Sequence, residues 1–404
     1  MNSWPLIPLD EIADVSAGNP APQDPSHFSD EGHPFVRMQD VGRVHVSPNL
    51  TETVDRITDA AVRQGGLRLY PKGTLLVPKS GASVNLNHRA MLGRAAYVVS
   101  HLATIVPDSQ RVDPSYLFHW SMVYDPRKQA QVTSLPSLPL SLIKAALVPL
   151  PPLEEQRRIV GRLDRAAEIR RRADAARAKA RAIIPALFLD TFGDPATNPK
   201  GWPVATVGDV LDSASYGTSQ KASDAGGGLP VIRMGNVTMN GQLDTTDLKY
   251  MELTEAEREK AELLEGDLLF NRTNSKGLVG KTGLWDGRFD AVAASYFIRL
   301  RVNRERIVPA YLWAFFNTSH MKRVLFQTAR GAIGQANINA KELRAFPVAT
   351  PSLPLQTAFA EQASRLESLA RHLDAAAAKA EAMAGGLSAE VFGSSPPQAT
   401  GRAA

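Results

Sequence analysis

The sequence contains no cysteine, and no apolar run is long enough to cross a bilayer. Without cysteine, disulfides and thiolate metal sites are excluded. The first residues, "MNSWPLIPLDEIADV", lack the basic segment and the following apolar segment of a signal peptide. We therefore expect a cytoplasmic protein.

Complete catalytic and metal-binding motifs are also missing. The stretch "SKGLVGKT" at 275–282 resembles a phosphate-binding loop, but Ser275 stands where that motif has its first glycine. The 8 histidines are scattered and none forms an H-E-x-x-H pair. No G-x-S-x-G nucleophile motif occurs either. These absences favour a binding protein over an enzyme, with no metal site.

What the sequence does contain is an internal repeat. "PFVRMQDV" at 34–41 matches "PVIRMGNV" at 230–237, and "DPSYLFHW" at 113–120 matches "VPAYLWAF" at 308–315. "LFLDTFG" at 187–193 matches "LSAEVFG" at 387–393. The chain is therefore two copies of one unit, a globular domain followed by a long helix.

Each globular copy combines strand and helix patterns, which predicts an α+β domain. "GTLLVP" and "GDLLFN" are short strand-like runs opened by glycine, and 294–302 alternates as a strand does. "PSYLFHWSMV" and "PAYLWAFFNTSHMKRVLF" are typical of amphipathic helices with proline in the first turn.

The two long helices have matched ends and matched apolar spacing. Pro152 and Pro354 stand in the first turn, whereas Pro185 and Gly385–Gly386 are predicted to kink or end the helices. The straight part, 153–184, would measure roughly 48 Å. Residues 153–190 carry 10 basic and 6 acidic side chains, whereas 355–392 carry 3 and 5, which favours pairing of the two segments.

A spacing that alternates 3 and 4 residues predicts an antiparallel coiled coil between these helices. The alternative, that each helix packs only on its own domain, does not account for the matched spacing. The predicted apolar seam is Ile159, Ile169, Ile183, Leu187, Phe359, Leu366, Leu369, Leu373 and Met383.

Loops in equivalent positions of both copies are rich in residues that bond phosphates and base edges. For any one such residue, a solvated turn is the simpler interpretation, but the set as a whole favours DNA contact. The candidates are Arg37, Gln39, Lys79, Ser80, Asn85, Asn87, Arg89, Arg233, Asn236, Arg272, Thr273, Asn274, Ser275, Lys276, Lys281, Arg330, Gln335 and Asn337.

Three segments resemble the DNA-specificity subunits of type I restriction-modification enzymes. They are "PLPPLEEQRRIV" at 149–160, "TFGDPATNPKGWPVATVGDV" at 191–210 and "GDLLFNRTNSKGLVGK" at 266–281. With the repeat, the resemblance covers Trp4 to Gly393. Thr74, where the family usually has an acidic residue after glycine, departs from the pattern, as does "LPSLPLSL" at 135–142.

The resemblance implies a non-catalytic DNA-binding subunit of a DNA adenine methyltransferase and restriction complex. Each target recognition domain would read one half of a bipartite double-stranded DNA site, and the helices would fix the gap. Two methyltransferase subunits would dock on the helices and hold S-adenosylmethionine, while this chain binds no cofactor. Motor-nuclease restriction subunits would join them. The candidate partner surface is Arg157, Arg158, Arg165, Arg170, Arg171 and Arg172.

The expected domains follow from the repeat and the resemblance together. They are a target recognition domain at 1–150, a spacer helix at 151–192, a second target recognition domain at 193–353, a second spacer helix at 354–393 and a disordered tail at 394–404.

Two other functions remain open at this point. A protein–protein scaffold with two adaptor domains on a coiled coil fits the zero net charge of residues 1–148. A nucleotide-using enzyme would require the 275–282 loop to bind phosphate. Salt-dependent DNA binding distinguishes the scaffold from a DNA reader.

Overall fold

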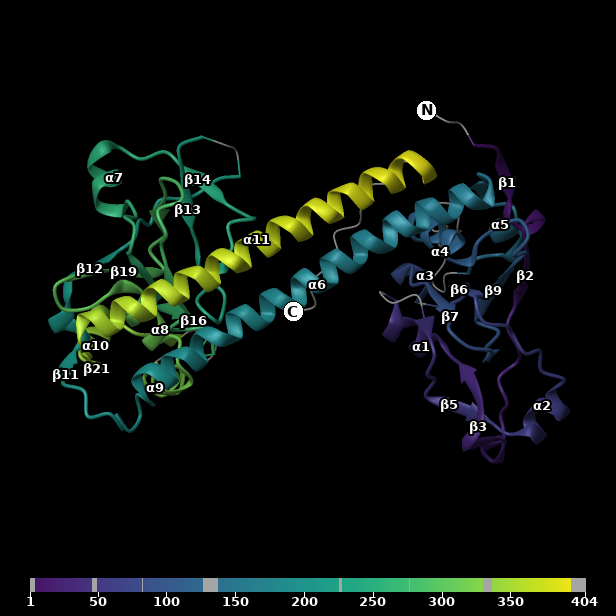
Figure 1. Ribbon diagram of the computed structural model, residues 1–404, viewed down its shortest axis with the longest axis horizontal. Helices are drawn as coiled ribbons and strands as arrows, with labels where there is room; N and C mark the ends of the chain where they lie inside the picture. Colours follow the sequence, from purple (N-terminus) through teal and green to yellow (C-terminus); the bar gives the residue numbers. More distant parts are fainter. Residues whose placement is uncertain are drawn as a thin grey trace. The chain divides into compact units, whose positions relative to one another are not determined.

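The computed structural model describes residues 4–45, 49–81, 83–125, 137–224, 227–275, 277–329 and 336–393 (Figure 1). The chain divides into two compact units, Met1–Ala173 with Ala375–Ala404, and Asp174–Asp374. Each unit contains a globular domain and parts of the long helices α6 (Leu153–Phe192) and α11 (Leu353–Phe392). Within the described ranges, no helix has the length and apolar content needed to span a membrane.

The first domain is built on a five-stranded sheet of order β2-β9-β6-β7-β4 and a three-stranded sheet of order β5-β3-β8. A separate two-stranded ribbon joins β1 to β10. The strands are β1 (Leu6–Pro8), β2 (Ala13–Ala17), β3 (Phe28–Val36), β4 (Asn49–Leu50), β5 (Asp55–Ile57), β6 (Leu75–Pro78), β7 (Ala90–Leu92), β8 (Tyr97–Val98), β9 (Leu102–Pro107) and β10 (Leu147–Pro149). The helices are α1 (Met38–Val44), α2 (Asp59–Gly65), α3 (Ser83–Leu86), α4 (Pro114–Val123) and α5 (Leu140–Lys144).

The second domain has sheets of order β12-β19-β15-β17 and β14-β13-β18, and the ribbons β11-β21 and β16-β20. The strands are β11 (Val204–Thr206), β12 (Leu211–Tyr216), β13 (Leu229–Ile232), β14 (Lys249–Met251), β15 (Leu268–Asn271), β16 (Thr273–Asn274), β17 (Thr282–Leu284), β18 (Val292–Ala293), β19 (Phe297–Val302), β20 (Ala336–Asn337) and β21 (Pro347–Ala349). The helices are α7 (Glu255–Ala261), α8 (Pro309–Phe316), α9 (Ser319–Thr328) and α10 (Ala340–Arg344).

The strand pairing of the two domains confirms the internal repeat. β9 lies between β2 and β6 as β19 lies between β12 and β15, all antiparallel. β3 pairs antiparallel with β5 and parallel with β8, and β13 does the same with β14 and β18. The predicted α+β class is confirmed, and the runs "GTLLVP", "GDLLFN" and 294–302 contain the strands β6, β15 and β19.

The strand β15 is buried throughout because its alternating side chains enter two different cores. Leu268 and Phe270 join one apolar cluster with α8, and Leu269 joins another around Trp285. The strand β6 repeats this arrangement in the first domain. This explains why both runs are apolar at nearly every position and do not alternate with polar residues.

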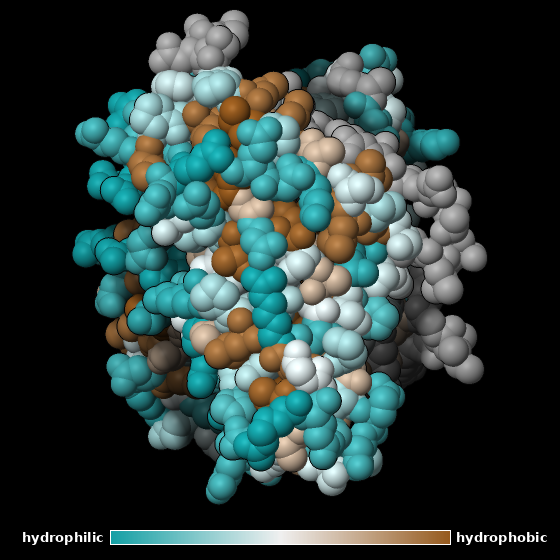
Figure 2. All heavy atoms as spheres, turned by 90° about the vertical axis from the view of Figure 1, so that its right-hand side faces the viewer, coloured by the Kyte–Doolittle hydropathy of each residue, from teal (hydrophilic) through white to brown (hydrophobic). Residues whose placement is uncertain are grey.

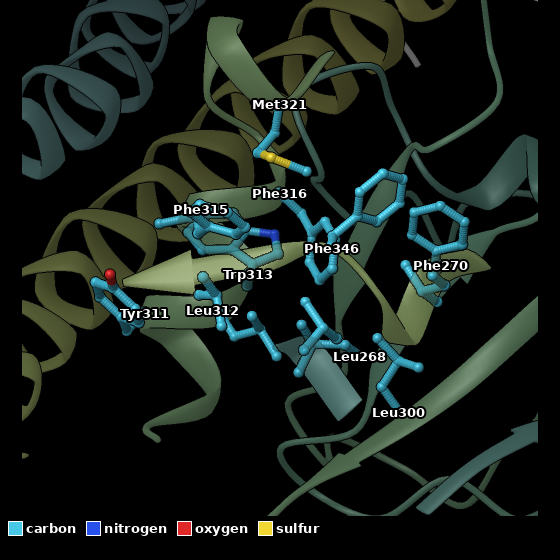
Figure 3. Close-up of a cluster of buried hydrophobic side chains, with 14 of the residues drawn as sticks. Leu268, Phe270, Leu300, Tyr311, Leu312, Trp313, Phe315, Phe316, Met321 and Phe346 are labelled. Carbon is cyan, nitrogen blue, oxygen red and sulfur yellow. The ribbon is translucent and has the colours of Figure 1, made fainter. Parts of the chain in front are cut away.

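The predicted helix at 309–326 is in fact two helices, and the first is not amphipathic. α8 is followed by α9 after Thr318, whose hydroxyl accepts a hydrogen bond from the backbone N–H of Met321. Residues 311–316 are all buried, so α8 is apolar on every side (Figure 3). The sequence pattern was misread because a helix surrounded by core shows no polar face.

Both long helices continue through the positions where a kink or end was predicted. α6 contains Pro185 and runs on to Phe192, and α11 contains Gly385 and Gly386. The prediction that the helices end there is wrong. Phe188 and Phe192 are buried in the core of the second domain, and that burial stabilises the turns after Pro185. With 40 residues, α6 is about 60 Å long, of which the stretch 153–184 accounts for about 48 Å.

α6 and α11 pack as an antiparallel coiled coil, as predicted. In the first unit Arg170 Nη1 lies 2.9 Å from Glu381 Oε1. In the second unit Arg177 is paired with Asp374, and Phe192 packs on Phe359, so residue numbers increase along α6 as they decrease along α11.

The seam differs from the prediction at every second position. Ile169, Ile183, Leu369 and Met383 are 43%, 48%, 50% and 65% exposed. Seam positions Ile159 and Phe359 are buried as predicted, and Leu187, Leu366 and Leu373 are half-buried. The other row is Leu163, Arg170, Arg177 and Ile184, with Ala363 and Ala370 on α11.

Two seams with alternating 3- and 4-residue spacing are possible on α6. Both contain the row 159, 166, 173, 180 and 187. They differ in the second row, which is either 162, 169, 176 and 183 or the row one residue later. Counting apolar side chains favoured the row of Ile169 and Ile183. The structure buries the neighbouring row, in which Leu163 and Ile184 join the domain cores and Arg170 and Arg177 reach acidic side chains on α11.

Candidate nucleic-acid interface

Each domain is joined to the helix that follows it by the same buried glutamine. Gln156 Oε1 accepts from the backbone N–H of Asp113 at 2.8 Å, and its Nε2 donates to the carbonyl of Pro151. Gln356 Oε1 accepts from the N–H of Val308 at 2.8 Å, and its Nε2 donates to Pro351. Both glutamines are fully buried, so these bonds are shielded from water.

A buried tyrosine closes the same junction in each domain. The hydroxyl of Tyr116 donates to the carbonyl of Pro149 at 2.7 Å, and that of Tyr311 donates to Ala349 at 2.8 Å. Burial raises the pKa of both hydroxyls well above the usual range. Sequence reasoning missed all four residues, although the glutamines recur at an offset of 200.

In each domain, equivalent residues gather at one end of the larger sheet. Two of them follow β6 or β15, one precedes β9 or β19, and one ends β2 or β12. We call this group the strand-end site: Lys79, Ser80, His101 and Ala17 in the first domain, and Arg272, Thr273, Tyr296 and Tyr216 in the second.

The backbone bonds of the two strand-end sites are the same. The backbone N–H of Lys79 donates to the carbonyl of His101 at 3.0 Å, and the N–H of Leu138 donates to the carbonyl of Lys79 at 2.7 Å. The backbone N–H of Arg272 donates to the carbonyl of Tyr296 at 2.9 Å, and the N–H of Ile338 donates to the carbonyl of Arg272 at 3.0 Å. The backbone is conserved between the copies while the side chains differ.

In the second domain several predicted DNA-binding residues meet at this site. The guanidinium of Arg272 lies 4.7 Å from the centre of the exposed Tyr216 ring. Thr273 pairs with Asn337 across β16 and β20, and its hydroxyl lies 3.3 Å from the Asn337 side-chain oxygen. Asn274 is in the same strand, and Ser275 is exposed beside it.

In the first domain Lys79 and Ser80 lie at the equivalent place. The Ser80 hydroxyl is 2.7 Å from Nδ1 of the exposed His101. Asn85 is exposed on α3, whereas Asn87 is half-buried and its side-chain oxygen accepts from Arg89 at 2.6 Å. Lys79 and Ser80 are therefore partly accessible at this site, with the Ser80 hydroxyl bonded to His101, whereas the side-chain oxygen of Asn87 is bonded to Arg89.

Three of the candidate DNA-binding side chains are buried and form hydrogen bonds within the domain. Arg89 is 1% exposed and donates to the carbonyl of His88. Asn236 is 3% exposed and accepts from the N–H of Arg233. Lys281 is 8% exposed, and its Nζ donates to the carbonyls of Met234 and Val237 at 2.7 and 2.6 Å.

The orientation of Lys281 also argues against the nucleotide-binding alternative. In a phosphate loop the lysine points to the phosphates, whereas here it points into the domain, and burial lowers its pKa. Its neighbour Lys322 donates to the carbonyl of Gly280 at 2.9 Å. Burial and the charge of Lys281 lower the pKa of Lys322 to about 8.

The remaining candidates lie apart from the strand-end site or beyond the described residues. Arg37 forms an ion pair with Asp55, Arg233 forms one with Asp247, and Gln39 is exposed on α1. Lys276, Arg330, Gln335 and the tail 394–404 fall outside the described residues.

The predicted partner surface on α6 is exposed, but several of its arginines have acidic partners. Arg158 pairs with Glu155, and both Arg171 and Arg172 pair with Glu168. Arg170 reaches Glu381 on α11. Arg157 and Arg165 are exposed, and Ile169, one turn after Arg165, is an exposed apolar side chain.

Figure 2 shows apolar side chains in scattered groups among hydrophilic ones on the face it presents. Among the described residues, no group of three or more His, Cys, Asp or Glu side chains could hold a metal ion. The two strand-end sites therefore form the candidate interface.

Comparison with known proteins identifies relatives with this organisation. The type I restriction modification DNA specificity domain matches residues 1–171 and 199–378. The EcoKI specificity subunit of Escherichia coli strain K12 is 28% identical over 56% of this chain and 51% of its own length. The putative MjaX specificity subunit of Methanocaldococcus jannaschii is 27% identical over 42% of this chain and 40% of its own length. The matches thus span about half of these relatives or less.

Solved structures share the fold over nearly the whole chain. The type I restriction-modification S subunit of M. genitalium has a TM-score of 0.59 at 14% identity, with 97% of both chains covered. A chain from a type I restriction-modification assembly has a TM-score of 0.55 at 18% identity, with 97% of this chain and 98% of the other covered. Because the family model matches both copies of the repeat, the chain belongs to the type I restriction modification DNA specificity domain family.

Proposed function

We propose that this chain is the specificity subunit of a type I restriction-modification system, and that each globular domain reads one half of a bipartite double-stranded DNA site. The observation that carries this is the strand-end site. The same backbone bonds hold Lys79 in one domain and Arg272 in the other, with different neighbouring side chains. Two equivalent readers that present different donors suit a site with two unlike halves.

The junctions support a spacing role for the helices. Gln156 and Gln356 bind the start of each helix to a backbone N–H of its own domain. A reader held in this way follows its helix as a rigid body. Helix length would therefore set the gap between the two half-sites.

The helices also have surface suited to partner helices. In the first unit Ile169 and Met383 are exposed, and in the second unit Ile183 and Leu369 are exposed. Apolar side chains flanked by arginines favour a helical protein partner, because burial of the apolar groups contributes to affinity and the charges to specificity. We assign these patches to two methyltransferase subunits.

In this proposal the chain is non-catalytic. The methyltransferase subunits hold S-adenosylmethionine and methylate adenine, and motor-nuclease subunits join the same complex. Arg157 and Arg165, which are exposed on α6, would contact the methyltransferase subunits and not DNA.

The test is single-molecule sequencing of methylated adenines in the host, with and without this gene. The proposal expects a bipartite methylated sequence that disappears when the gene is removed. A continuous sequence, or a methylation pattern that does not depend on the gene, would contradict it.

A domain exchange tests the independence of the two readers. Replacing residues 195–350 with the equivalent unit of a relative should change one half-site and leave the other unchanged. A change in both halves would show that the domains do not read separately.

A further inference from the structure

In the second strand-end site, Arg272 is held by one face of an aromatic ring and has no acidic partner among the described residues. Its guanidinium carbon lies 4.7 Å from the centre of the Tyr216 ring. Its Nε is buried without a hydrogen-bond partner, the side chain as a whole is half-buried, and the described residues show no hydrogen bond or ion pair to its Nη groups. The charge is therefore stabilised by the ring, and the Nη donors stay open to a ligand.

Stacking orients the guanidinium without using its hydrogen-bond donors. The ring contacts the flat face of the group, and the N–H bonds point outward in its plane. Because Arg272 is already held, less side-chain entropy is lost when those donors bind. The arrangement is that of a preformed planar fork.

Three exposed residues lie on or beside the strands next to Arg272. The side chains of Tyr216 and Tyr296 are 47% and 44% exposed. The backbone carbonyl of Tyr296 accepts a hydrogen bond from the backbone N–H of Arg272. Asn337 is exposed on the neighbouring strand β20. An arginine, two tyrosines and an asparagine at the ends of adjacent strands form a surface rich in donors and aromatic rings.

Comparison with the first domain separates base reading from phosphate binding. Lys79, Ala17 and His101 take the places of Arg272, Tyr216 and Tyr296 on the same backbone. Lys79 is a point charge, which suits a phosphate, whereas Arg272 presents a planar fork of donors that also matches the edge of a base. A position where the two copies differ in shape and donor pattern is suited to reading bases.

We propose that Arg272, held on Tyr216, reads one guanine of the half-site bound by the second domain, by donating two hydrogen bonds to its O6 and N7. This pairing is the commonest specific contact of arginine in the major groove. The inference rests on the proposed function and adds a specificity-determining residue and its base. Lys79 is the corresponding position for the other half-site.

The experiment uses the full-length chain in complex with its methyltransferase subunits. Its substrates are DNA duplexes carrying the methylated site found in the host, with each base pair substituted in turn. Binding is measured for the wild type and for Arg272→Ala, Arg272→Lys, Tyr216→Phe, Tyr216→Ala and Lys79→Ala. Arg258→Ala is the charge-matched control, because Arg258 lies on α7 and pairs with Glu262 and Asp290.

We expect Arg272→Ala to reduce discrimination at one G·C pair by about 5- to 150-fold and to leave the other half-site unchanged. Arg272→Lys should lose the same discrimination, because a lysine lacks the planar fork. Tyr216→Phe should keep it, and Tyr216→Ala should weaken it. Lys79→Ala should alter only the opposite half-site, and Arg258→Ala neither.

Several results would overturn the inference. If Arg272→Ala weakens binding equally for all sequences, lowers the salt slope by about one, and is rescued by Arg272→Lys, then Arg272 binds a phosphate. Unchanged discrimination in a folded Arg272→Lys complex, judged by its melting temperature, would also refute it. If the wild-type complex shows no sequence preference, the proposed function itself fails.

Discussion

Lys322 should destabilise the second domain at neutral pH, and replacing it with methionine should stabilise the protein. Burial and the nearby charge of Lys281 lower the pKa of Lys322 from 10.5 to about 8. At about 1.4 kcal/mol for each pH unit, keeping this amine charged in the folded state costs roughly 3 kcal/mol. Lys322→Met removes that cost and retains most of the side-chain volume.

One hydrogen bond is lost in the exchange. Lys322 Nζ donates to the carbonyl of Gly280, which also accepts from the hydroxyl of Thr282 at 3.1 Å. The carbonyl therefore keeps a partner, and the loss is about 1 kcal/mol. The net expectation at pH 7 is a gain of about 2 kcal/mol in the free energy of unfolding.

The sign of the pH dependence follows from the lowered pKa. Between pH 8 and 10.5 the unfolded chain binds the Lys322 proton and the folded chain does not, so wild-type stability rises through this window. The advantage of Lys322→Met should therefore be full at or below about pH 7 and shrink as the pH approaches 10.5.

The assay is urea unfolding of the full-length chain at several pH values from 7 to 10.5, comparing the wild type with Lys322→Met. Lys341→Met, at an exposed position on α10, is the control and should change stability by less than about 0.5 kcal/mol at every pH. A variant less stable than the wild type at pH 7, or an advantage that does not vary with pH, would refute the reasoning.

Three other predictions follow from the repeat. Phe192→Ala should cost about 3–5 kcal/mol in the unfolding of the second unit, because three aromatic rings surround this side chain, and calorimetry should show a smaller loss for the half-buried Phe392→Ala. Gln356→Leu should leave the N–H of Val308 unpaired and cost about 1–3 kcal/mol in chemical denaturation, and an unchanged midpoint would contradict the role of the junction. Ile169→Asp should weaken co-purification of methyltransferase subunits without lowering the melting temperature, whereas a lower melting temperature would place Ile169 in the core.

Local patterns were sufficient for the repeat, the class of each domain and the pairing of the long helices. Repeated motifs such as "RMQDV" and "RMGNV" recur in order, and short apolar runs after glycine become the central strands. These features depend on residues that are close together in the sequence, so the periodicity and composition of a short segment are enough to predict them.

The candidate site was only partly predictable, because burial depends on residues distant in the chain. Arg272, Thr273 and Asn337 were identified and meet at one place, since a solvated loop keeps its polar residues exposed. Lys281 looked equally available, yet carbonyls more than forty residues away bind its amine. Tyr216 was missed because it contacts Arg272 only in the folded sheet, where β19 lies between β12, which carries Tyr216, and β15, which precedes Arg272.

The long helices show most clearly where local patterns and tertiary structure diverge. Heptad spacing alone established that α6 and α11 pair, because a repeat of apolar residues every 3.5 positions needs an apolar partner. Which of two adjacent rows is buried depends on the globular domains, because Leu163 and Ile184 of the buried row join the domain cores, whereas exposed ion pairs such as Arg170–Glu381 contribute little. That α6 continues past Pro185 was decided by the second domain, where burial of Phe192 outweighs the missing backbone hydrogen bond.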